Sequence, residues 1–464
     1  MKIQITLNGA LKELRVPPMK RMLDVLREDC GLLGAKEGCG EGECGACAVI
    51  MDDALVDTCL IPAIQMAGRR VDTVEGLAAP KGMGDFELDD LQKFFLEEGA
   101  VHCGFCTPGM IMAAVALLRR NPHPTEEEVH VSLAGNICRC TGYEKICNAV
   151  LRAAEAGYGD RLTPGRNLCT EMRPVFEGDE ADKFFSPRSL KEALDVLSSQ
   201  RDVLILSGGT DIGPDTKGGR IRPVRVMDVF SVPEMNGIEV VGEGTDAYIR
   251  IGACATNTDI VTCAATRKHL PALVIASSRS GALAMQNRAT IGGNICTASG
   301  AGDLPVALLA LGALCVAAGP DAERIVALDD FITGYRKNVL ASDELLKEIR
   351  VPMPAPGSRQ VFYKRGSRKA LTLSRASLAF YVDVRNGKIA AFRASAGSMS
   401  PVPIRLKNLS AAMPGRALSE SLPMEAARLA YGDVNPRKTP KYRKTMIANL
   451  THRFFSEVCE GVKA

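Results

Sequence analysis

Four cysteines near the start of the chain have the spacing of ligands to one redox cluster. Cys39, Cys44 and Cys47 follow one another in C-x4-C-x2-C order, and Cys59 comes after eleven further residues. This is the plant-type ferredoxin pattern for a [2Fe–2S] cluster. A structural zinc site is the alternative, but zinc sites usually present two separated C-x2-C pairs. The spacing therefore favours a cluster that transfers electrons.

The residues around these thiols predict a small sheet that carries a tight loop. Glycines throughout the stretch let the backbone turn sharply and let N–H groups approach the sulfurs. The apolar run 48–51 predicts a strand, and the polar turn after it brings the fourth thiol back to the loop. Asn8-Gly9 predicts a hairpin, and apolar spacing from Met22 predicts a helix that Gly31 ends. Together these elements predict a β-grasp ferredoxin-like domain.

A second group of four cysteines follows in two short motifs. Cys103 and Cys106 lie in HCGFCTPG, and Cys138 and Cys140 lie in GNICRCTGY. Apolar spacing predicts four helices around them, over 89–98, 107–120, from a Thr125/Glu128 capping box onward, and over 143–156. A four-helix bundle brings turns at one end together, so the two pairs can meet. Zinc would fit these pairs taken alone, but after a ferredoxin quartet they favour a second [2Fe–2S] cluster.

Two segments further along are suited to bind a phosphate-bearing cofactor. The predicted strand 203–206 runs into SGGTDIG, whose Gly208-Gly209-Thr210 offers backbone N–H groups and a hydroxyl. An ordinary turn at a strand end would explain this motif equally well. The second segment, RATIGGNICTASGAGD, is dense in small polar residues and ends on Asp303. Two such loops in one domain predict a pyrophosphate held between them, with Asp303 on a ribose or ribityl hydroxyl.

Composition excludes several classes of function. The 464 residues suffice for about three domains. A net charge of +3 and the absence of Trp argue against a nucleic-acid partner. The longest apolar run, 306–319, is too short to cross a bilayer and predicts a buried segment. Sixteen cysteines with no visible export signal predict a cytoplasmic protein with reduced thiols.

The last part of the chain predicts a small mixed domain. Strands are expected over 361–364, 377–384 and 389–396, and helices over 424–431 and 441–455. The basic stretch 437–444 could indicate an anionic partner. We interpret it as the solvated start of the last helix, because the apolar residues after it supply an ordinary buried face.

With both quartets, SGGTDIG and ATIGGNICTASG in this order, the chain resembles the iron–sulfur and flavin part of the molybdenum hydroxylases, the xanthine dehydrogenase family. The resemblance implies an α+β multidomain fold with FAD as the flavin. Its domains would be a plant-type [2Fe–2S] domain at 1–76, a helical [2Fe–2S] domain at 77–157, a linker at 158–180, a PCMH/vanillyl-alcohol-oxidase-like FAD domain at 181–352 and a C-terminal flavoprotein domain at 353–464.

The resemblance also implies individual site residues. The FAD contacts would be Ile205, Leu206, Ser207, Gly208, Gly209, Thr210, Asp211, Ile212, Thr290, Gly293, Asn294, Thr297, Asp303, Leu346 and Lys364. Cys140 and the HCGFC turn would face the pterin of a partner chain. Family members commonly have Gln at His102, and Asp-Ile-Ala where this chain has Thr372-Leu373-Ser374 in the loop led by Lys364. These departures concern the pterin contact and access of NAD to the flavin.

Because no molybdopterin portion follows residue 464, the likeness implies the smaller, electron-transferring subunit of a bacterial xanthine dehydrogenase-type enzyme. Electrons would pass from the molybdopterin centre of a large subunit through two [2Fe–2S] clusters to FAD, and then to NAD or another acceptor. A dimer of such heterodimers is expected, with no catalytic residue in this chain. The alternatives are the small subunit of an aromatic, heterocycle or aldehyde hydroxylase, a stand-alone flavin reductase, and a zinc-holding assembly scaffold.

Overall fold

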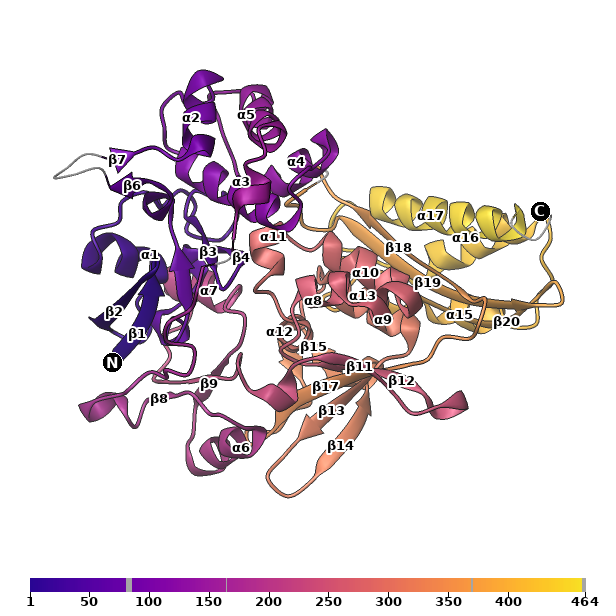
Figure 1. Cartoon of the computed structure of the whole chain (residues 1–464). Helices are drawn as coiled ribbons and strands as arrows, with labels where there is room; N and C mark the ends of the chain where they lie inside the picture. Colours follow the sequence, from indigo (N-terminus) through magenta and orange to yellow (C-terminus); the bar gives the residue numbers. More distant parts are fainter. Residues whose placement is uncertain (81–85, 164, 369, 461–464) are drawn as a thin grey trace. The chain divides into compact units, whose positions relative to one another are not determined.

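The computed structural model describes residues 1–80, 86–163, 165–368 and 370–460 (Figure 1). Pro164 of the expected linker and Lys369 of the lysine-led loop lie outside them. The chain divides into two units. Unit 1 comprises Met1–Ser186, Asp202–Asp228 and Gly281–Arg288. Unit 2 comprises Pro187–Arg201, Val229–Ser280 and Ala289–Ala464.

Unit 1 begins with a five-stranded sheet of order β2-β1-β5-β3-β4. Its strands are β1 Lys2–Leu7, β2 Ala10–Arg15, β3 Ala48–Met51, β4 Ala54–Asp57 and β5 Arg70–Asp72. The predicted hairpin is confirmed, because β1 pairs with β2 across Asn8 and Gly9, whose φ angles are 48° and 79°. Positive φ at both positions is typical of a type I′ turn. The buried side chains Ile3 and Ile5 point from β1 into the core.

The expected helix after this hairpin is present in an altered form. It begins as α1 (Met22–Asp24) and continues as a π-helical turn over Val25–Asp29. The N–H of Cys30 donates to the carbonyl of Val25, a wider bond than an α-helix makes. Val25 and Leu26 in this turn are fully buried in the core of the first domain. Gly31 then ends the segment with a φ of 71°, as predicted.

The four predicted helices of the second domain are confirmed in unit 1. They are α2 Asp90–Glu97, α3 Thr107–Arg120, α4 Glu126–Leu133 and α5 Glu144–Glu155. The Thr125/Glu128 capping box starts α4 as expected, and Asp89 with Gln92 forms another at the start of α2. The two cysteine motifs immediately precede α3 and α5, so these helix starts determine where the thiols lie.

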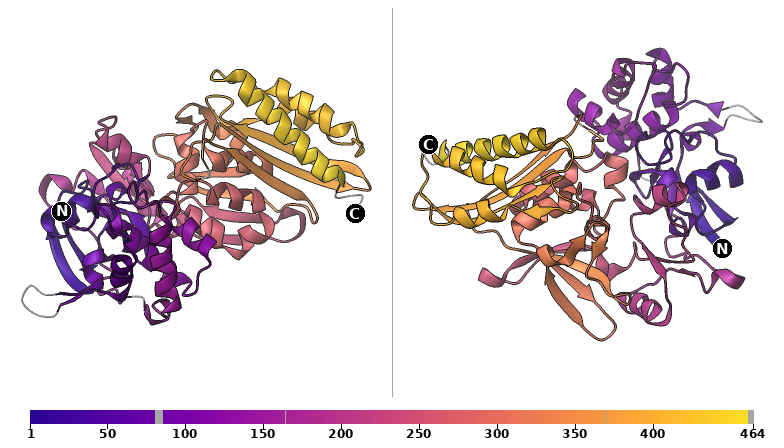
Figure 2. Two further views of the ribbon diagram at one scale, coloured as in Figure 1. Left: turned by 90° about the horizontal axis from the view of Figure 1, so that it is seen from above. Right: turned by 180° about the vertical axis from the view of Figure 1, so that it is seen from behind.

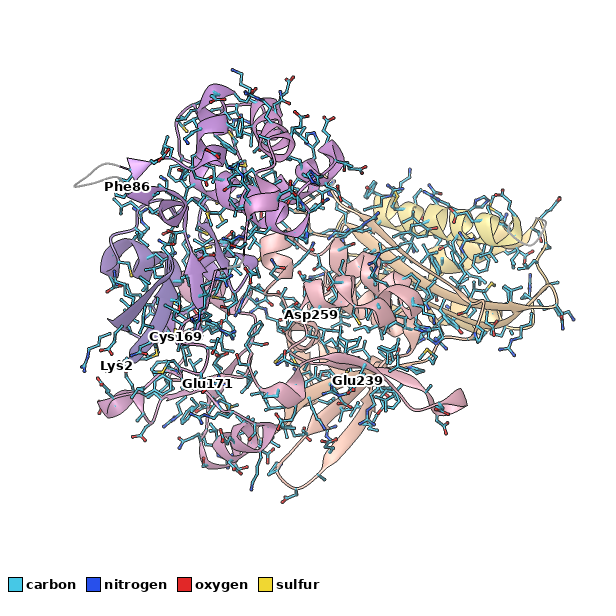
Figure 3. The ribbon with its side chains drawn as sticks, in the orientation of Figure 1. Lys2, Phe86, Cys169, Glu171, Glu239 and Asp259 are labelled. Atoms are coloured by element: carbon cyan, nitrogen blue, oxygen red, sulfur yellow. The ribbon has the colours of Figure 1, made fainter. Side chains whose placement is uncertain are left out.

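The rest of unit 1 is mostly irregular. Residues 165–176 lie along β1, where Lys2 pairs with Val175 and the buried Cys169 contacts Thr6 (Figure 3). A parallel sheet of order β8-β10-β9 follows. The remaining elements described here are β6 Ala79–Pro80, β7 Phe86–Glu87, β8 Phe184–Phe185, β9 Val203–Leu206, α7 Ile212–Lys217, β10 Arg225–Asp228 and α11 Leu283–Gln286.

Unit 2 contains a five-stranded sheet of order β11-β12-β17-β13-β14. Its strands are β11 Ile238–Val241, β12 Tyr248–Gly252, β13 Leu314–Ala318, β14 Glu323–Ala327 and β17 Leu345–Pro352. The accompanying elements are α6 Leu190–Ser199, α8 Asn257–Thr262, α9 Ala264–His269, α10 Pro271–Ser278, α12 Ile291–Thr297, α13 Asp303–Leu311, α14 Leu328–Phe331, β15 Ile332–Gly334 and β16 Lys337–Asn338. The apolar run 306–319 forms most of α13 and β13 and is almost entirely buried, as expected.

The second polar segment, expected as a loop, is instead half helical. Thr290 caps α12, since its Oγ1 accepts the N–H of Gly293 at 3.1 Å. Gly292 packs so closely that an added Cβ would lie 2.6 Å from the carbonyl oxygen of Ala253. Packing against the neighbouring backbone thus overrides the poor helix propensity of the glycines.

The C-terminal part of unit 2 is a sheet of order β18-β19-β20-β21 between two layers of helices (Figure 2). α16 and α17 cover one face, and α10 and α13 pack on the other. All three predicted strands and both predicted helices are confirmed. The bounds are β18 Arg359–Arg365, β19 Ala376–Arg385, β20 Lys388–Gly397, β21 Ile404–Arg405, α15 Lys407–Ala412, α16 Leu422–Asp433 and α17 Pro440–Glu460.

Stacked aromatic rings hold α17 on this sheet. The rings of Phe380 on β19 and Phe454 on α17 are stacked with centroids 4.4 Å apart, and within α17 the ring of Phe455 meets that of Phe454 edge to face at 5.3 Å. All three side chains are fully buried, so each contributes a large apolar area to the core. Over the described residues, no helix is both long and apolar enough to span a membrane.

Candidate cluster and flavin sites

The loop that carries the first three cysteines surrounds its sulfurs with backbone N–H groups. The Sγ of Cys39 accepts the N–H groups of Glu41 and Glu43, each at 3.3 Å, and the N–H of Cys39 donates to the Sγ of Cys44 at 3.3 Å. Gly38 lies so close that an added Cβ would be 2.7 Å from this second sulfur. Donors of this kind stabilise thiolates and tune a bound cluster.

The first quartet is divided into two sulfur pairs. A hydrogen bond from the thiol of Cys44, together with the backbone donors, lowers the pKa of Cys39. Cys47 and Cys59 are both buried, and the β3–β4 hairpin brings their thiols into hydrogen-bond contact. That contact and burial raise the pKa of Cys47. The predicted return of the chain to the loop is therefore present.

The second quartet is divided in the same way. The Sγ atoms of Cys103 and Cys140 are 3.7 Å apart and exposed, whereas Cys106 and Cys138 form a more buried pair. Burial and the contact with Cys138 raise the pKa of Cys106 to about 12. Burial alone would raise the pKa of Cys138, but hydrogen bonds from the hydroxyl and N–H of Thr141 outweigh it and lower that pKa.

This pairing fits diiron clusters. A [2Fe–2S] cluster with four cysteine ligands takes two thiolates on each iron, so two neighbouring pairs are the arrangement it requires. Among the described residues, no three or more His, Cys, Asp or Glu side chains converge as ligands of a single metal ion. The N–H groups directed at sulfur, the absence of room for a Cβ at Gly38 and the paired thiols all suit a cluster at each quartet.

Direct hydrogen bonds join the two cysteine loops. The N–H of Ile137 donates to the carbonyl of Cys44 at 2.9 Å, and the buried Asn136 donates from Nδ2 to the carbonyl of Gly45 at 3.0 Å. Gly109 of α3 packs on the same carbonyl, where an added Cβ would approach to 2.1 Å. One peptide bond and one hydrogen bond therefore separate Cys138 from Cys44.

The first flavin segment (SGGTDIG, residues 207–213) is fixed to the first cysteine domain by a buried polar network in unit 1. Gln65 donates from Nε2 to the carbonyl of Ser207 and to Asp228 Oδ1, both at 2.7 Å. Arg288 donates to the side-chain oxygen of Gln65 and to the carbonyl of Gly208. The side chains of Gln65, Asp228 and Arg288 are all buried, which makes these contacts costly to break.

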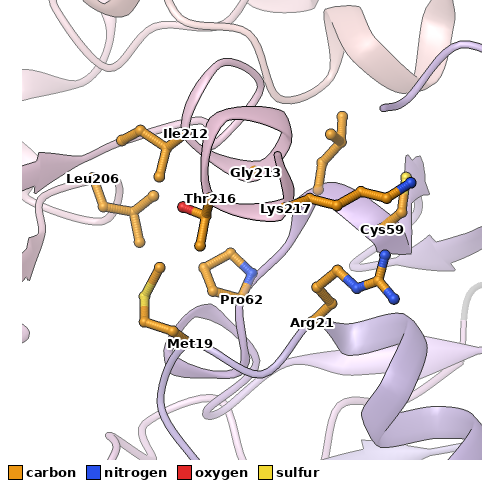
Figure 4. A pocket seen from close by; sticks show the side chains of 10 residues that line it. Met19, Arg21, Cys59, Pro62, Leu206, Ile212, Gly213, Thr216 and Lys217 are labelled. Atoms are coloured by element: carbon orange, nitrogen blue, oxygen red, sulfur yellow. The ribbon is translucent and has the colours of Figure 1, made fainter. Parts of the chain in front are cut away.

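A pocket lies where this segment meets the cysteine domain (Figure 4). Side chains of β9 and α7, including Leu206 and Lys217, face Met19, Arg21 and Cys59 across it. Lys217 donates from Nζ to the carbonyl of Cys39 at 2.7 Å. The first flavin segment and both ends of the first quartet therefore share one small region of unit 1.

Apart from Arg288, the second flavin segment (RATIGGNICTASGAGD, residues 288–303) lies in unit 2, as do Leu346 and Lys364. Asn294 has a buried Oδ1 without a hydrogen-bond partner among the described residues, which suits contact with a bound ligand. Asp303 Oδ2 accepts from Lys364 Nζ at 2.6 Å, and Oδ1 accepts from Ser374 Oγ at 2.6 Å. Burial raises the pKa of Asp303, although Lys364 opposes this effect.

Several residues of the candidate sites carry no local sequence signal. Gln65 and Asn136 are buried amides whose partners lie far away in sequence. Arg288 opens the second flavin segment, but its partners Gln65 and Gly208 also lie far away in sequence. Ser374 is an exception, because it lies in the loop that departs from the family pattern. Its hydroxyl donates a hydrogen bond to Asp303, so the altered loop places a hydroxyl group beside this carboxylate.

Four family models match successive parts of the chain. They are described as the 2Fe-2S iron-sulfur cluster binding domain (residues 5–68), the [2Fe-2S] binding domain (73–151), the FAD binding domain in molybdopterin dehydrogenase (177–354) and the CO dehydrogenase flavoprotein C-terminal domain (361–458). The third match includes residues from both units.

Individual proteins agree with these matches. The nicotinate dehydrogenase small FeS subunit of Eubacterium barkeri is 52% identical over 153 residues, which are 33% of this chain and 94% of that subunit. A xanthine dehydrogenase of Emericella nidulans is 25% identical over 100% of this chain, but the match spans only 39% of that protein. A carbon monoxide dehydrogenase structure from Hydrogenophaga pseudoflava is 26% identical with a TM-score of 0.55, covering 58% of this chain and 94% of that one.

The domains and the paired thiols define an iron–sulfur flavoprotein with sites for two [2Fe–2S] clusters and FAD. The chain belongs to the molybdenum hydroxylase, or xanthine dehydrogenase, family and corresponds to its iron–sulfur and FAD portion. It is an oxidoreductase chain whose part in that family is electron transfer, as the sequence motifs predict.

Proposed function

We propose that this chain is the electron-transferring subunit of a cytoplasmic molybdenum-containing dehydrogenase, whose separate large subunit holds a molybdopterin centre. The observation that carries the proposal is the continuity of contacts within unit 1. Hydrogen bonds link the second cysteine loop to the first, and buried side chains link the first cysteine domain to the first flavin segment. Candidate cofactor sites that are joined by such short chains of bonds suit the transfer of electrons from one cofactor to the next.

The residues that would hold the cofactors are those of the motifs. We propose residues 1–76 and 77–157 as the two cluster domains, 158–180 as a linker, and 181–352 and 353–464 as the flavin domains. The cluster ligands would be Cys39, Cys44, Cys47, Cys59, Cys103, Cys106, Cys138 and Cys140. The FAD contacts would be Ile205 to Ile212, Thr290, Gly293, Asn294, Thr297, Asp303, Leu346 and Lys364.

When bound, the clusters carry single electrons and FAD accepts and donates them in pairs, so that a two-electron oxidation in a partner can be matched to a two-electron acceptor. The protein's own task is to hold these groups close together, to supply N–H donors to sulfur and to exclude water. The exclusion of water is supported by the complete or near-complete burial of Cys47, Cys59 and Leu60. No acid–base residue of this chain is required.

The exposed end of the second quartet suits the partner. Cys103 and Cys140 are exposed, and the apolar side chains next to the quartet, Phe105 and Ile137, are 46% and 47% exposed. Exposed large apolar residues beside a redox centre fit a face that another protein covers. We propose that the molybdopterin subunit docks here, and that two such heterodimers associate.

The first test counts cofactors and separates the clusters. The purified chain should contain about four irons and one FAD, as two [2Fe–2S] clusters require. Cys39→Ser and Cys103→Ser should each remove one distinct electron paramagnetic resonance signal and leave FAD bound. Cys459→Ser, outside both quartets, should change neither signal. Loss of both signals in either variant, or a single signal in the parent, would overturn the assignment.

Identifying the substrate and the electron acceptor requires assays of the complete enzyme. Xanthine or another purine as substrate, with NAD as electron acceptor, is our first proposal, because several matched relatives are xanthine dehydrogenases. A nitrogen heterocycle such as nicotinate is the second, because the cluster domains are 52% identical to a nicotinate dehydrogenase small FeS subunit. Copurifying the partner and assaying both substrates would decide between them. Oxidation of NADH by the isolated chain, in the absence of any partner subunit, would favour a stand-alone flavin reductase.

A further inference from the structure

Helix α7, which begins in the first flavin segment, lies against the first cysteine domain within unit 1. Gly213 packs so closely that an added Cβ would lie 3.3 Å from the Cα of Leu60, the residue after the proposed ligand Cys59. Lys217 follows Gly213 by four residues, so it lies on the same face of the helix. The helix therefore directs this lysine toward the loop that carries the first three cysteines.

The ammonium of Lys217 is bonded to a proposed cluster ligand. Its Nζ donates to the carbonyl of Cys39 at 2.7 Å and pairs with Glu37 Oε1 at 3.0 Å. Gly40 leaves room for the ammonium, because an added Cβ at this glycine would lie 2.1 Å from Nζ. Lys217 and Cys59 also line the same pocket (Figure 4). One positive charge of the flavin segment's helix is thus placed beside the first quartet.

Ion pairs hold this ammonium in place. Glu37 accepts from Lys217 and is itself held by a bidentate pair with Arg21, at 3.0 and 2.8 Å. Arg21 also donates twice to Asp24, at 2.7 and 2.8 Å. The two cations and two anions of this group balance in charge. Removal of one member therefore leaves a net charge beside the cysteine loop, opposite in sign to the charge that was removed.

A cation at this position favours an added electron. Reduction of a [2Fe–2S] cluster adds one negative charge, so the reduction potential of the cluster depends on the charges and hydrogen bonds around it. Lys217 draws electron density from the peptide of Cys39 through its hydrogen bond and adds its own charge. The lysine side chain is 36% exposed, so water screens this charge only in part.

We propose that Lys217 raises the reduction potential of the first cluster and so favours the transfer of an electron to it from the second cluster. The inference rests on the proposed function, in which Cys39 is a cluster ligand and electrons pass through both clusters to FAD. In this step the second cluster loses one electron and the first gains it, with no bond formed or broken. Lys217 is a positioning residue, because it acts through the peptide of Cys39 and through its charge.

The test is a redox titration of the purified full chain, followed by electron paramagnetic resonance. The signal that is lost in Cys39→Ser identifies the first cluster. Lys217→Gln should make reduction of this cluster less favourable by about tenfold, which is about 59 mV for a one-electron couple. Glu37→Gln should raise the potential, because it removes the opposite charge. Lys217→Arg keeps the charge and should stay within about twofold of the parent.

Lys183→Gln is the matched control, because in the described part of the chain this exposed lysine of unit 1 makes no side-chain bond to a cysteine loop. It should change the potential less than about twofold, since solvent and salt screen exposed charges. An unchanged potential in Lys217→Gln, or a lowered one in Glu37→Gln, overturns the proposal. Loss of the first signal in Lys217→Gln also overturns it, because the lysine would then only support the loop. A parent with fewer than two cluster signals would overturn the proposed function as well, so the two failures give different results.

Discussion

The ion pair between Lys364 and Asp303 is among the most buried in the described part of the chain. The two side chains are only 8% and 4% exposed, and Nζ lies 2.6 Å from Oδ2. Lys364→Met would leave a buried carboxylate with one neutral donor. We expect it to lower the free energy of unfolding by about 3–5 kcal/mol, measured by chemical denaturation. FAD content measured alongside tests whether the pair also supports the flavin.

A double variant separates lost charge pairing from lost packing. Lys364→Met with Asp303→Asn removes both charges, so most of the stability lost in the single variant should return. Equal stability of the single and double variants would mean that the ion pair contributes nothing beyond the lysine stem. The pKa of Asp303 is already raised by burial, and removal of Lys364 should raise it further.

Gly109 is the residue on which the contact between the two cysteine loops depends most directly. An added Cβ would lie 2.1 Å from the carbonyl oxygen of Gly45, a backbone atom that cannot move independently. We expect Gly109→Ala to push the loops apart and weaken the magnetic interaction between the two clusters, measured by paramagnetic resonance. Gly432→Ala is the control, because this helical glycine has open space around it and should gain about 0.5–1 kcal/mol.

At the scale of secondary structure, Glu348 joins two strands of the sheet in unit 2. Its oxygens accept from Arg250 on β12 at 2.6 Å and from Arg350 on β17 at 2.7 Å. Burial alone would raise the pKa of Glu348, but the two arginines outweigh it and hold the pKa below its ordinary value of 4.5. Protons therefore bind this carboxyl more tightly in the unfolded chain than in the folded one.

This difference predicts how stability depends on pH. A carboxyl with a lowered pKa stabilises the fold above its ordinary pKa, and the effect is lost as pH falls through the folded value. Glu348→Gln should cost about 2 kcal/mol at neutral pH. The difference from the parent should shrink below about pH 4. Urea denaturation at several pH values measures this, and a constant difference from neutral to acidic pH would contradict it.

Local patterns predicted most elements, and the exceptions have physical causes. The hairpin at Asn8-Gly9 and the four helices around the second quartet follow from turn chemistry, capping and apolar spacing. The π-helical turn after α1 and the helix α12 do not, and in α12 packing against distant backbone overrides local preference. Tertiary contacts of that kind leave no periodic signal in a single sequence.

The candidate sites also contain some residues that local sequence patterns reveal and others that they do not. Thiols at ligand spacing could be recognised because several ligands come from one loop. The network of Gln65 with Arg288 could not, since its members are separated by 223 residues and each is an ordinary polar residue in its own segment. Likewise, the basic stretch at 437–444 predicted a charged segment, but not that Arg437 and Lys438 line a cavity in unit 2. The opposite wall of that cavity comes from the loop after β20, which is distant in sequence.

At the scale of the whole molecule, unit 1 places the two quartets in an order. Cys103 and Cys140 are exposed, Cys44 receives a hydrogen bond from the second quartet's loop, and Cys59 is buried beside the first flavin segment. Electrons that enter at the exposed pair would therefore cross the second quartet first. If the proposed molybdopterin subunit delivers electrons in this order, we expect it to dock at the face around Phe105 and Ile137.

That expectation gives the last prediction. Phe105→Ser with Ile137→Ser should weaken association with the molybdopterin subunit by about 30–1,000-fold, because central apolar anchors contribute about 1–2 kcal/mol each. Analytical ultracentrifugation measures the affinity, and both cluster signals must persist to exclude damage to the loops. Leu96→Ser, at a side chain 56% exposed on α2, is the matched control and should leave association unchanged. Normal association of the double variant would place the partner elsewhere, and the exposed quartet would then need another electron donor.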